Sequence, residues 1–220
     1  ITSHEYCQHN PKEAMLVNGE SVKKLFDVFP EAKIIFISTD AVFPLNTHLA
    51  NEKTMTNPTT VYGKSKELGE KYIIKSSGNS CIIRTTIVGK NINSGKQSFA
   101  EWIINSVRVG KNIKLYEDTM FTPISIWHLA KELEWVINNK VPTVLHIAGT
   151  EIVSKYDFGY NLCKELRLNL DLIGRGKLNQ KTEIKRSNDQ TLNSSLYQSI
   201  SKHRLPDLRE IIKILVENFQ

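Results

Sequence analysis

The chain has 220 residues, of which 40% are apolar and 24% are charged, and its formal net charge is +6. These values are typical of a globular protein with one sizeable core, and no apolar run approaches the roughly 20 residues that cross a bilayer. No signal peptide is recognisable and the lysines are dispersed, so we expect a cytoplasmic protein without a membrane or nucleic-acid partner.

The cysteines indicate neither disulfides nor a metal site. Cys7, Cys81 and Cys163 are odd in number and lack the spacing of metal ligands. Cys81 lies in an apolar run that is typical of a buried strand, so buried and reduced thiols are expected. We therefore expect no metal in the site.

Residues 11–29 form the first long segment with apolar side chains at helical spacing, which predicts a helix. Residues 33–37 are continuously apolar and β-branched, which predicts a strand covered on both faces. Ser38, Thr39 and Asp40 follow at its carboxyl end, where open α/β sheets place their ligands. Thr39 is the hydroxyl that we expect to orient a substrate carbonyl, whereas Asp40 has the alternative role of a turn or cap carboxylate.

A polar loop, residues 44–60, is expected to line the mouth of the site and to end at a helix cap, Thr59 or Thr60. The following helix carries Tyr62 and Lys66, which share one helical face because they are four residues apart. An ordinary phenol has a pKa of about 10, and a neighbouring ammonium lowers that pKa. Tyr62 would then serve as an acid or base at a carbonyl.

The spacing alone does not identify a site. Tyr160 and Lys164 repeat it within an ordinary amphipathic helix, where no catalytic role is expected. Tyr62 differs because it follows a strand with hydroxyl residues at its end and then a long loop. The alternative is that Tyr62 is a surface helix residue whose lysine is solvated.

Short strands and helices alternate in the rest of the chain. The predicted strands lie at residues 80–86, 111–116 and 144–147, and the predicted helices at residues 99–109, 127–138, 154–168 and 208–219. Gly174-Arg175-Gly176 follows no convincing strand and lacks a third glycine, so we interpret it as a surface turn and not as a phosphate loop.

Three motifs occur in the order found in the extended short-chain dehydrogenases/reductases. They are Ser38-Thr39-Asp40-Ala41-Val42-Phe43, Asn57-Pro58-Thr59-Thr60-Val61-Tyr62-Gly63-Lys64-Ser65-Lys66 and Arg84-Thr85-Thr86-Ile87-Val88-Gly89. Within that superfamily, the chain most resembles the dTDP-4-dehydrorhamnose reductases, from about residue 2 to residue 149.

This resemblance implies an α/β fold, with a Rossmann-like doubly wound parallel sheet and a small C-terminal substrate lobe. Residues 1–88, with part of 112–147, would belong to the dinucleotide-binding domain, and residues 89–220 mostly to the lobe. The family's glycine-rich turn holds the cofactor pyrophosphate, but no such pattern occurs here, so the N-terminal strands of the family are expected to be missing. Residues 33–37 would then expose an apolar strand edge and promote aggregation.

The resemblance also implies a role for each residue of the site. Tyr62 would give its proton to the carbonyl oxygen, Thr39 would orient that oxygen, and Lys66 would hold the nicotinamide ribose. The catalytic residues would be Thr39, Tyr62 and Lys66; the cofactor-binding residues Ser38, Tyr62, Lys66, Thr85 and Thr86; and the substrate-binding residues Thr39, Asp40 and Ile87. The implied cofactor is NADP or NAD, the implied substrate is a nucleotide-linked 4-keto-sugar, and a homodimer is compatible with the sequence.

Three departures from the family's pattern bear on the substrate. Ala41 stands where the reductases usually have tyrosine, Pro44-Leu45 replaces Asp-Gly, and Ile87 stands where an aromatic residue often contacts the sugar. A sugar-nucleotide dehydratase or epimerase is therefore one alternative. A non-catalytic subunit of the type that regulates methionine adenosyltransferase is another, because it keeps a Tyr-Gly-Lys-Xaa-Lys segment.

Overall fold

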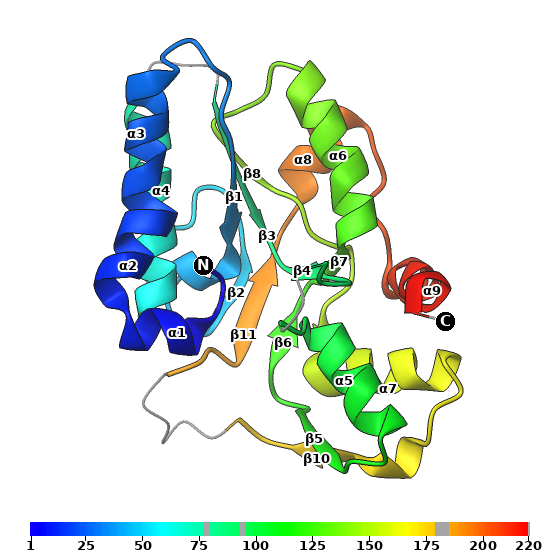
Figure 1. The fold of residues 1–220 in the computed structure, drawn as a ribbon. Helices are drawn as coiled ribbons and strands as arrows, with labels where there is room; N and C mark the ends of the chain where they lie inside the picture. The colour runs from blue at the N-terminus through cyan, green and yellow to red at the C-terminus, as the bar shows by residue number, and fades with distance from the viewer. Residues whose placement is uncertain (77–79, 93–95, 179–184, 220) are drawn as a thin grey trace.

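The computed structural model describes residues 1–76, 80–92, 96–178 and 185–219. At its centre lies a parallel sheet with the strand order β1 (Ile35–Thr39), β3 (Cys81–Thr85), β8 (Val144–His146). Helices lie on both sides of the sheet (Figure 1): α3 (Ser21–Val28) and α4 (Val61–Lys75) on one, and α6 (Ile126–Asn138) and α8 (Ser195–Ser201) on the other. The expected α/β fold with a parallel sheet is confirmed.

The N-terminal helical region is more divided than the predicted helix over residues 11–29. It consists of α1 (His4–His9), α2 (Pro11–Met15), the π-helical segment η1 (Leu16–Glu20) and then α3. Pro11 begins α2 because its missing N–H is not needed there. The π-helical turn contains Asn18, which is buried against α4.

Strand β1 starts two residues later than predicted and includes Thr39. Its first three residues are only half buried, although side chains pack against both faces of the strand. The reason is its place in the sheet, since β1 pairs with β3 and with no second strand in the described part of the chain. Its other edge is therefore unpaired there.

Helix α4 is capped by Thr60, whose side chain accepts a hydrogen bond from the Gly63 N–H at 3.1 Å. Two glycines let this helix approach the strand closely. A Cβ on Gly63 would lie 2.2 Å from the Ala41 carbonyl oxygen, and a Cβ on Gly69 would lie 2.5 Å from the Phe36 ring. Only the absence of a side chain at these positions brings α4 against β1.

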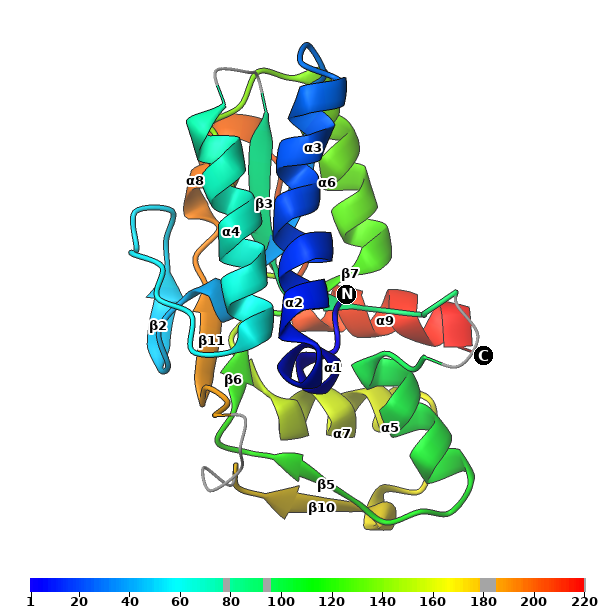
Figure 2. The ribbon, with the colours of Figure 1, turned by 60° about the vertical axis from the view of Figure 1, so that its left-hand side comes forward.

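The second half of the chain forms a layer beyond the carboxyl ends of the central strands (Figure 2). Helices α5 (Phe99–Arg108), α7 (Lys155–Glu165) and α9 (Leu208–Phe219) share one apolar core, which includes Phe121, Phe158 and Leu215. Helix α5 starts with a capping box between Ser98 and Glu101. These three helices match the predicted positions closely.

Several short strands complete the fold. Strand β2 (Thr47–Ala50) and strand β11 (Asp189–Leu192) were not predicted, and they join a four-stranded sheet with β6 (Met120–Phe121) and β9 (Val153–Ser154). The remaining short elements are β4 (Ile87–Val88), β7 (Ile124–Ser125), η2 (Asp40–Val42) and η3 (Leu170–Leu172).

The interpretation of Gly174-Arg175-Gly176 as a surface turn was wrong. These residues belong to β10 (Ile173–Gly176), which pairs in parallel with β5 (Ile113–Tyr116). Strand β10 forms because it pairs with a segment that is distant in the sequence. Its two glycines have no preference for strand structure, so the local sequence does not predict it.

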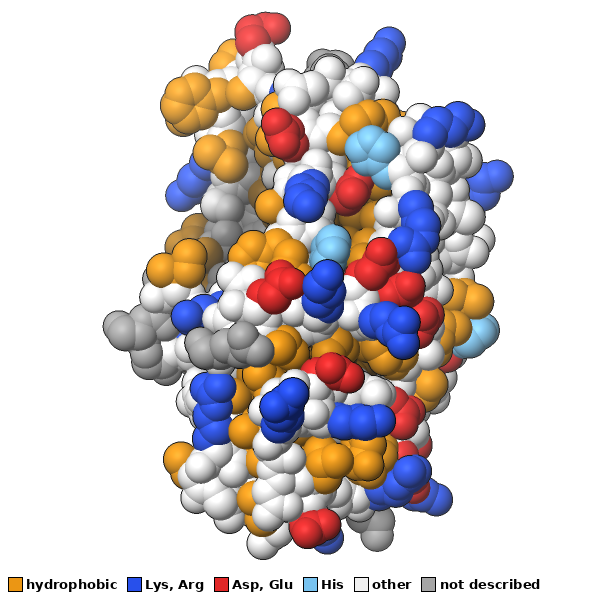
Figure 3. Space-filling view, turned by 90° about the vertical axis from the view of Figure 1, so that its right-hand side faces the viewer, with side chains coloured by type: hydrophobic (Ala, Val, Ile, Leu, Met, Phe, Trp, Pro, Cys, Tyr) orange, Lys and Arg blue, Asp and Glu red, His pale blue; other side chains and the backbone are white. Residues whose placement is uncertain are grey.

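Charged side chains of both signs are interspersed on the face shown in Figure 3, with no large area of one sign. In the described ranges, no helix is both long and apolar enough to cross a membrane. The three cysteines are buried and unpaired, as the sequence predicted.

Candidate active site

Thr39, Asp40 and Tyr62 meet at the carboxyl end of β1. The Thr39 hydroxyl donates to Asp40 Oδ1 at 2.7 Å, and its oxygen accepts from the Ala41 N–H at 3.2 Å. Thr39 also lies close enough to the Tyr62 side chain to lower the pKa of the phenol. The three predicted residues therefore form one connected group, in which Asp40 holds the hydroxyl hydrogen that a substrate carbonyl would need.

The Tyr62 phenol is more firmly protonated than the sequence predicted. Burial raises the pKa of Tyr62 to about 12, although the neighbouring Thr39 side chain opposes the rise. The nearby Asp40 carboxylate raises the pKa further. The expectation that Lys66 lowers this pKa was wrong for this structure, because burial dominates and the phenol stays neutral at physiological pH.

Lys66 lies beside Phe36 of β1, with its Nζ 4.0 Å from the ring centroid. Burial lowers the pKa of Lys66 to about 8, and the neighbouring Glu70 carboxylate opposes that shift. No hydrogen bond or ion pair joins the ammonium to another described residue. Its N–H donors are therefore free to bind a ligand.

Ser38 belongs to a buried network beneath the site, although the sequence suggested cofactor binding. Its hydroxyl donates to Glu70 Oε1 at 2.5 Å, and Arg84 donates to both oxygens of the same carboxylate, at 3.0 and 2.6 Å. Both charged side chains are almost completely buried. This network ties α4, which carries Tyr62 and Lys66, to β1 and β3.

Thr85 and Thr86 lie next to Thr39, because Thr39 pairs with Thr85 in the parallel register of β1 and β3. The hydroxyls of Thr85 and Thr86 are buried without a hydrogen-bond partner. Buried hydroxyls of this kind need partners, so their donors and acceptors suit the amide and hydroxyl groups of a nicotinamide ribose. Ile87 is 43% exposed, and it does not line the cavity described next.

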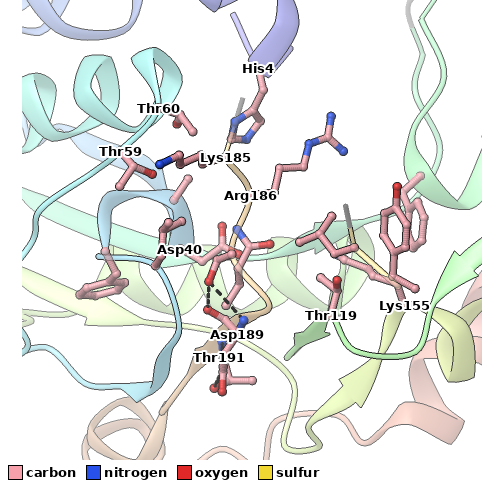
Figure 4. A pocket seen from close by; sticks show the side chains of 18 of the residues that line it. His4, Asp40, Thr59, Thr60, Thr119, Lys155, Lys185, Arg186, Asp189 and Thr191 are labelled. Carbon is pink, nitrogen blue, oxygen red and sulfur yellow. Dashed lines mark hydrogen bonds between the residues drawn. The ribbon is translucent and has the colours of Figure 1, made fainter. Parts of the chain in front are cut away.

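A cavity of about 590 Å³ opens beside this group, between the sheet and the lower layer. Figure 4 shows Asp40 and His4 on its wall, with the cations Lys185 and Arg186 nearby. The helix-capping Thr60 also lines it, so the polar loop reaches the site as predicted. In the part of the chain that is described, no cluster of three or more His, Cys, Asp or Glu side chains could hold a metal ion.

Two residues of this cavity were not predicted from the sequence. His4 packs on Tyr62 with 4.6 Å between ring centroids, and burial lowers its pKa to about 4, so its imidazole is neutral. Lys155, the first residue of α7, reaches the cavity from the opposite half of the chain. The only local signal was a lysine directly after a helix-capping serine, where the helix dipole disfavours a cation.

Asn18 supports α4 through a direct contact. Its side-chain amide donates to Ser65 Oγ at 3.0 Å, one residue before Lys66. This contact links the N-terminal helical region to the helix that carries Lys66.

The model of one protein family, described as the RmlD substrate binding domain, matches residues 1–220. A probable low-salt glycan biosynthesis reductase of Haloferax volcanii is 28% identical over 177 residues, which are 78% of this chain and 59% of the relative. The spore coat polysaccharide biosynthesis protein SpsK of Bacillus subtilis is 28% identical over 176 residues, 79% of this chain and 61% of the relative. The dTDP-4-dehydrorhamnose reductase of Escherichia coli is 27% identical over 228 residues, 96% of this chain and 75% of the relative. The chain thus spans less than two thirds of the first two relatives.

Solved structures show the same fold. A dTDP-4-dehydrorhamnose reductase of Bacillus anthracis, in complex with NADP, superposes with a TM-score of 0.90 at 18% identity, over 99% of this chain and 78% of that one. A reductase of the same name from Clostridium acetobutylicum gives a TM-score of 0.86 at 24% identity, over 100% and 78%.

Proposed function

Because the chain belongs to the RmlD substrate-binding domain family, we propose that it reduces the keto group of a nucleotide-linked 4-keto-sugar with NADPH or NADH. The names of its relatives, a dTDP-4-dehydrorhamnose reductase and a glycan biosynthesis reductase, support a sugar-nucleotide substrate. A role in dTDP-rhamnose biosynthesis is the finer form of this proposal.

One observation carries the proposal: a neutral phenol and a threonine hydroxyl lie behind the wall of a cavity large enough for a sugar nucleotide. Thr39 contacts this wall through Asp40, and Tyr62 contacts it through His4. Reduction of a carbonyl needs a proton donor at the oxygen. Tyr62 remains protonated at physiological pH because it is buried, so it fits that role.

The side chains divide the work at the substrate oxygen. Tyr62 donates its proton to the oxygen as negative charge develops there. Thr39 orients the same oxygen, which requires its hydroxyl hydrogen to turn away from Asp40. When the substrate is absent, Asp40 accepts the hydrogen bond from Thr39 and holds this side chain in place.

The described residues fit a nicotinamide cofactor. Lys66 would hold the ribose hydroxyls with its free N–H donors, and Thr85 and Thr86 have unpartnered hydroxyls at the same strand ends. When bound, the nicotinamide supplies the hydride for the carbonyl carbon. Ser38 contributes to this region by fixing Glu70 and thus the position of α4.

We also propose that residues 1–88, with part of 112–147, form the cofactor half, and that residues 89–220 mostly form the substrate lobe. The pairing of β8 with β3 supports the assignment of part of residues 112–147 to the cofactor half. Helix α8, which also lies beside the central sheet, supports an interleaved arrangement of the two halves. Ile87, near the end of the first half, would contact the substrate only from outside the cavity described above.

The experiment is an assay of the purified full-length protein with NADPH or NADH and a panel of nucleotide-linked 4-keto-sugars, with identification of the product. The proposal predicts that one cofactor molecule is oxidised for each sugar nucleotide consumed. In the product, the keto group at carbon 4 is replaced by a hydroxyl group. A dehydratase or epimerase would change the sugar without net cofactor oxidation. A regulatory subunit would leave both the sugar nucleotide and the cofactor unchanged. A synthetase would be recovered with it in a pull-down.

A further inference from the structure

Lys155 is a half-buried cation without a polar partner in the described part of the chain. Its Nζ lies 3.3 Å from the centroid of the Phe121 ring and 5.0 Å from that of Phe99. It makes no hydrogen bond or ion pair with another described residue. The aromatic faces attract the charge but leave the three N–H donors without acceptors.

Two features oppose a purely structural role for Lys155. It occupies the first turn of α7, where the positive end of the helix dipole repels a cation. Burial lowers its pKa to about 8, which reflects the cost of keeping the ammonium away from water. Ionisable side chains that line a cavity and have a strongly shifted pKa are frequent at functional sites.

Asp40 is the acidic group that partly compensates this charge, although burial raises the pKa of its carboxyl. Each group shifts the pKa of the other in the direction expected for opposite charges, yet the two form no ion pair. Asp40 Oδ1 is engaged by Thr39, which places the carboxylate next to the proposed reaction centre. A donor and an acceptor therefore face the same cavity from different halves of the chain.

We infer that Lys155 and Asp40 form the subsite that binds the hydroxyl groups of the sugar ring. Hydroxyls can accept from the ammonium and donate to the carboxylate, and they need no charge of their own because the two groups offset each other. A diphosphate is the poorer occupant, because Asp40 would repel it. The inference rests on the proposed function, since it places the sugar beside Thr39.

The test compares the binding of dTDP and dTDP-glucose to the full-length protein by calorimetry. The variants are Lys155→Met, which removes the ammonium but keeps the chain length, and Lys164→Met, an exposed lysine on the same helix. A hydrogen bond to a charged group corresponds to about 10- to 100-fold in affinity. Lys155→Met should therefore bind dTDP-glucose more weakly by about this factor and dTDP unchanged, whereas Lys164→Met should match the unmodified protein for both.

Three results would overturn the inference. An equal loss of dTDP and dTDP-glucose affinity in Lys155→Met would assign the lysine to the diphosphate. Unchanged affinity for both ligands, or no binding of dTDP-glucose by the unmodified protein, would remove its role in sugar binding. A thermal melt without ligand checks the fold of Lys155→Met, and Lys155→Arg, which keeps the charge, should restore part of the lost affinity.

The measurement needs no hydride transfer. A protein that binds the sugar through Lys155 but oxidises no cofactor would contradict the proposed reduction and retain this subsite.

Discussion

Glu70 ties α4, the helix that carries Tyr62 and Lys66, to the central sheet. Its carboxylate accepts from Arg84 Nε at 3.0 Å, from Arg84 Nη2 at 2.6 Å and from Ser38 Oγ at 2.5 Å. The side chains of Arg84 and Glu70 are only 5% and 2% exposed. Replacing Glu70 by Gln removes the negative charge and leaves the buried guanidinium without a counterion.

The expected loss of stability follows from this burial. Removing one partner of a buried ion pair costs about 3–5 kcal/mol, because the remaining charge is uncompensated. In a domain of this size, 1 kcal/mol lowers the melting temperature by about 2–4 °C. We therefore expect Glu70→Gln to lower the melting temperature by roughly 6–20 °C.

The assay is thermal and urea unfolding of Glu70→Gln beside a matched control. Lys71→Met removes an exposed i,i+4 ion pair with Glu67 on the same helix, which is worth less than about 0.5 kcal/mol. The double variant Glu70→Leu with Arg84→Met replaces the pair by apolar groups and should recover much of the loss. If Glu70→Gln unfolds like the Lys71 control, the buried network does not hold α4.

Three further predictions concern the site. Lys66 is charged below its pKa of about 8, so the affinity for NADPH should fall as the pH rises through that value. In Lys66→Arg, which stays charged, the affinity should not fall over this pH range. An equal fall in both proteins would contradict the role of the ammonium. Thr60→Ala should lower the free energy of unfolding by about 1 kcal/mol through loss of the cap, whereas Thr59→Ala should have little effect; equal urea midpoints would refute the cap. Gly63→Ala should destabilise the protein and reduce turnover, because the new Cβ would lie 2.2 Å from a backbone oxygen, while Gly174→Ala, with neighbours no nearer than 3.6 Å, should be tolerated in both the melt and the assay.

Local patterns were sufficient to predict much of the site. The Thr60 cap, the strand that ends at Thr39 and the helix that carries Tyr62 all follow from residue types within a few positions of one another. Their convergence follows from the rule that parallel strands place ligands at their carboxyl ends. The family resemblance then supplied the expected roles, and the family itself is confirmed.

The remainder depends on packing between distant segments. The pKa of Tyr62 is set by burial, which the spacing to Lys66 does not reveal. Strand β10 exists because it pairs with β5, 60 residues earlier in the register that joins Ile173 to Ile113. Lys155 reaches the cavity only through the fold of the second half.

The most direct test of the account compares Tyr62→Phe with Tyr160→Phe, which alters the tyrosine of the second Tyr-Xaa-Xaa-Xaa-Lys pair. Turnover with a nucleotide-linked 4-keto-sugar and the dissociation constant for NADPH are measured for both variants. A general acid contributes about 10²- to 10⁴-fold, so Tyr62→Phe should lose turnover by this factor while NADPH affinity stays nearly intact, and Tyr160→Phe should be unchanged. Equal turnover in the two variants would contradict the assignment of Tyr62 as the proton donor.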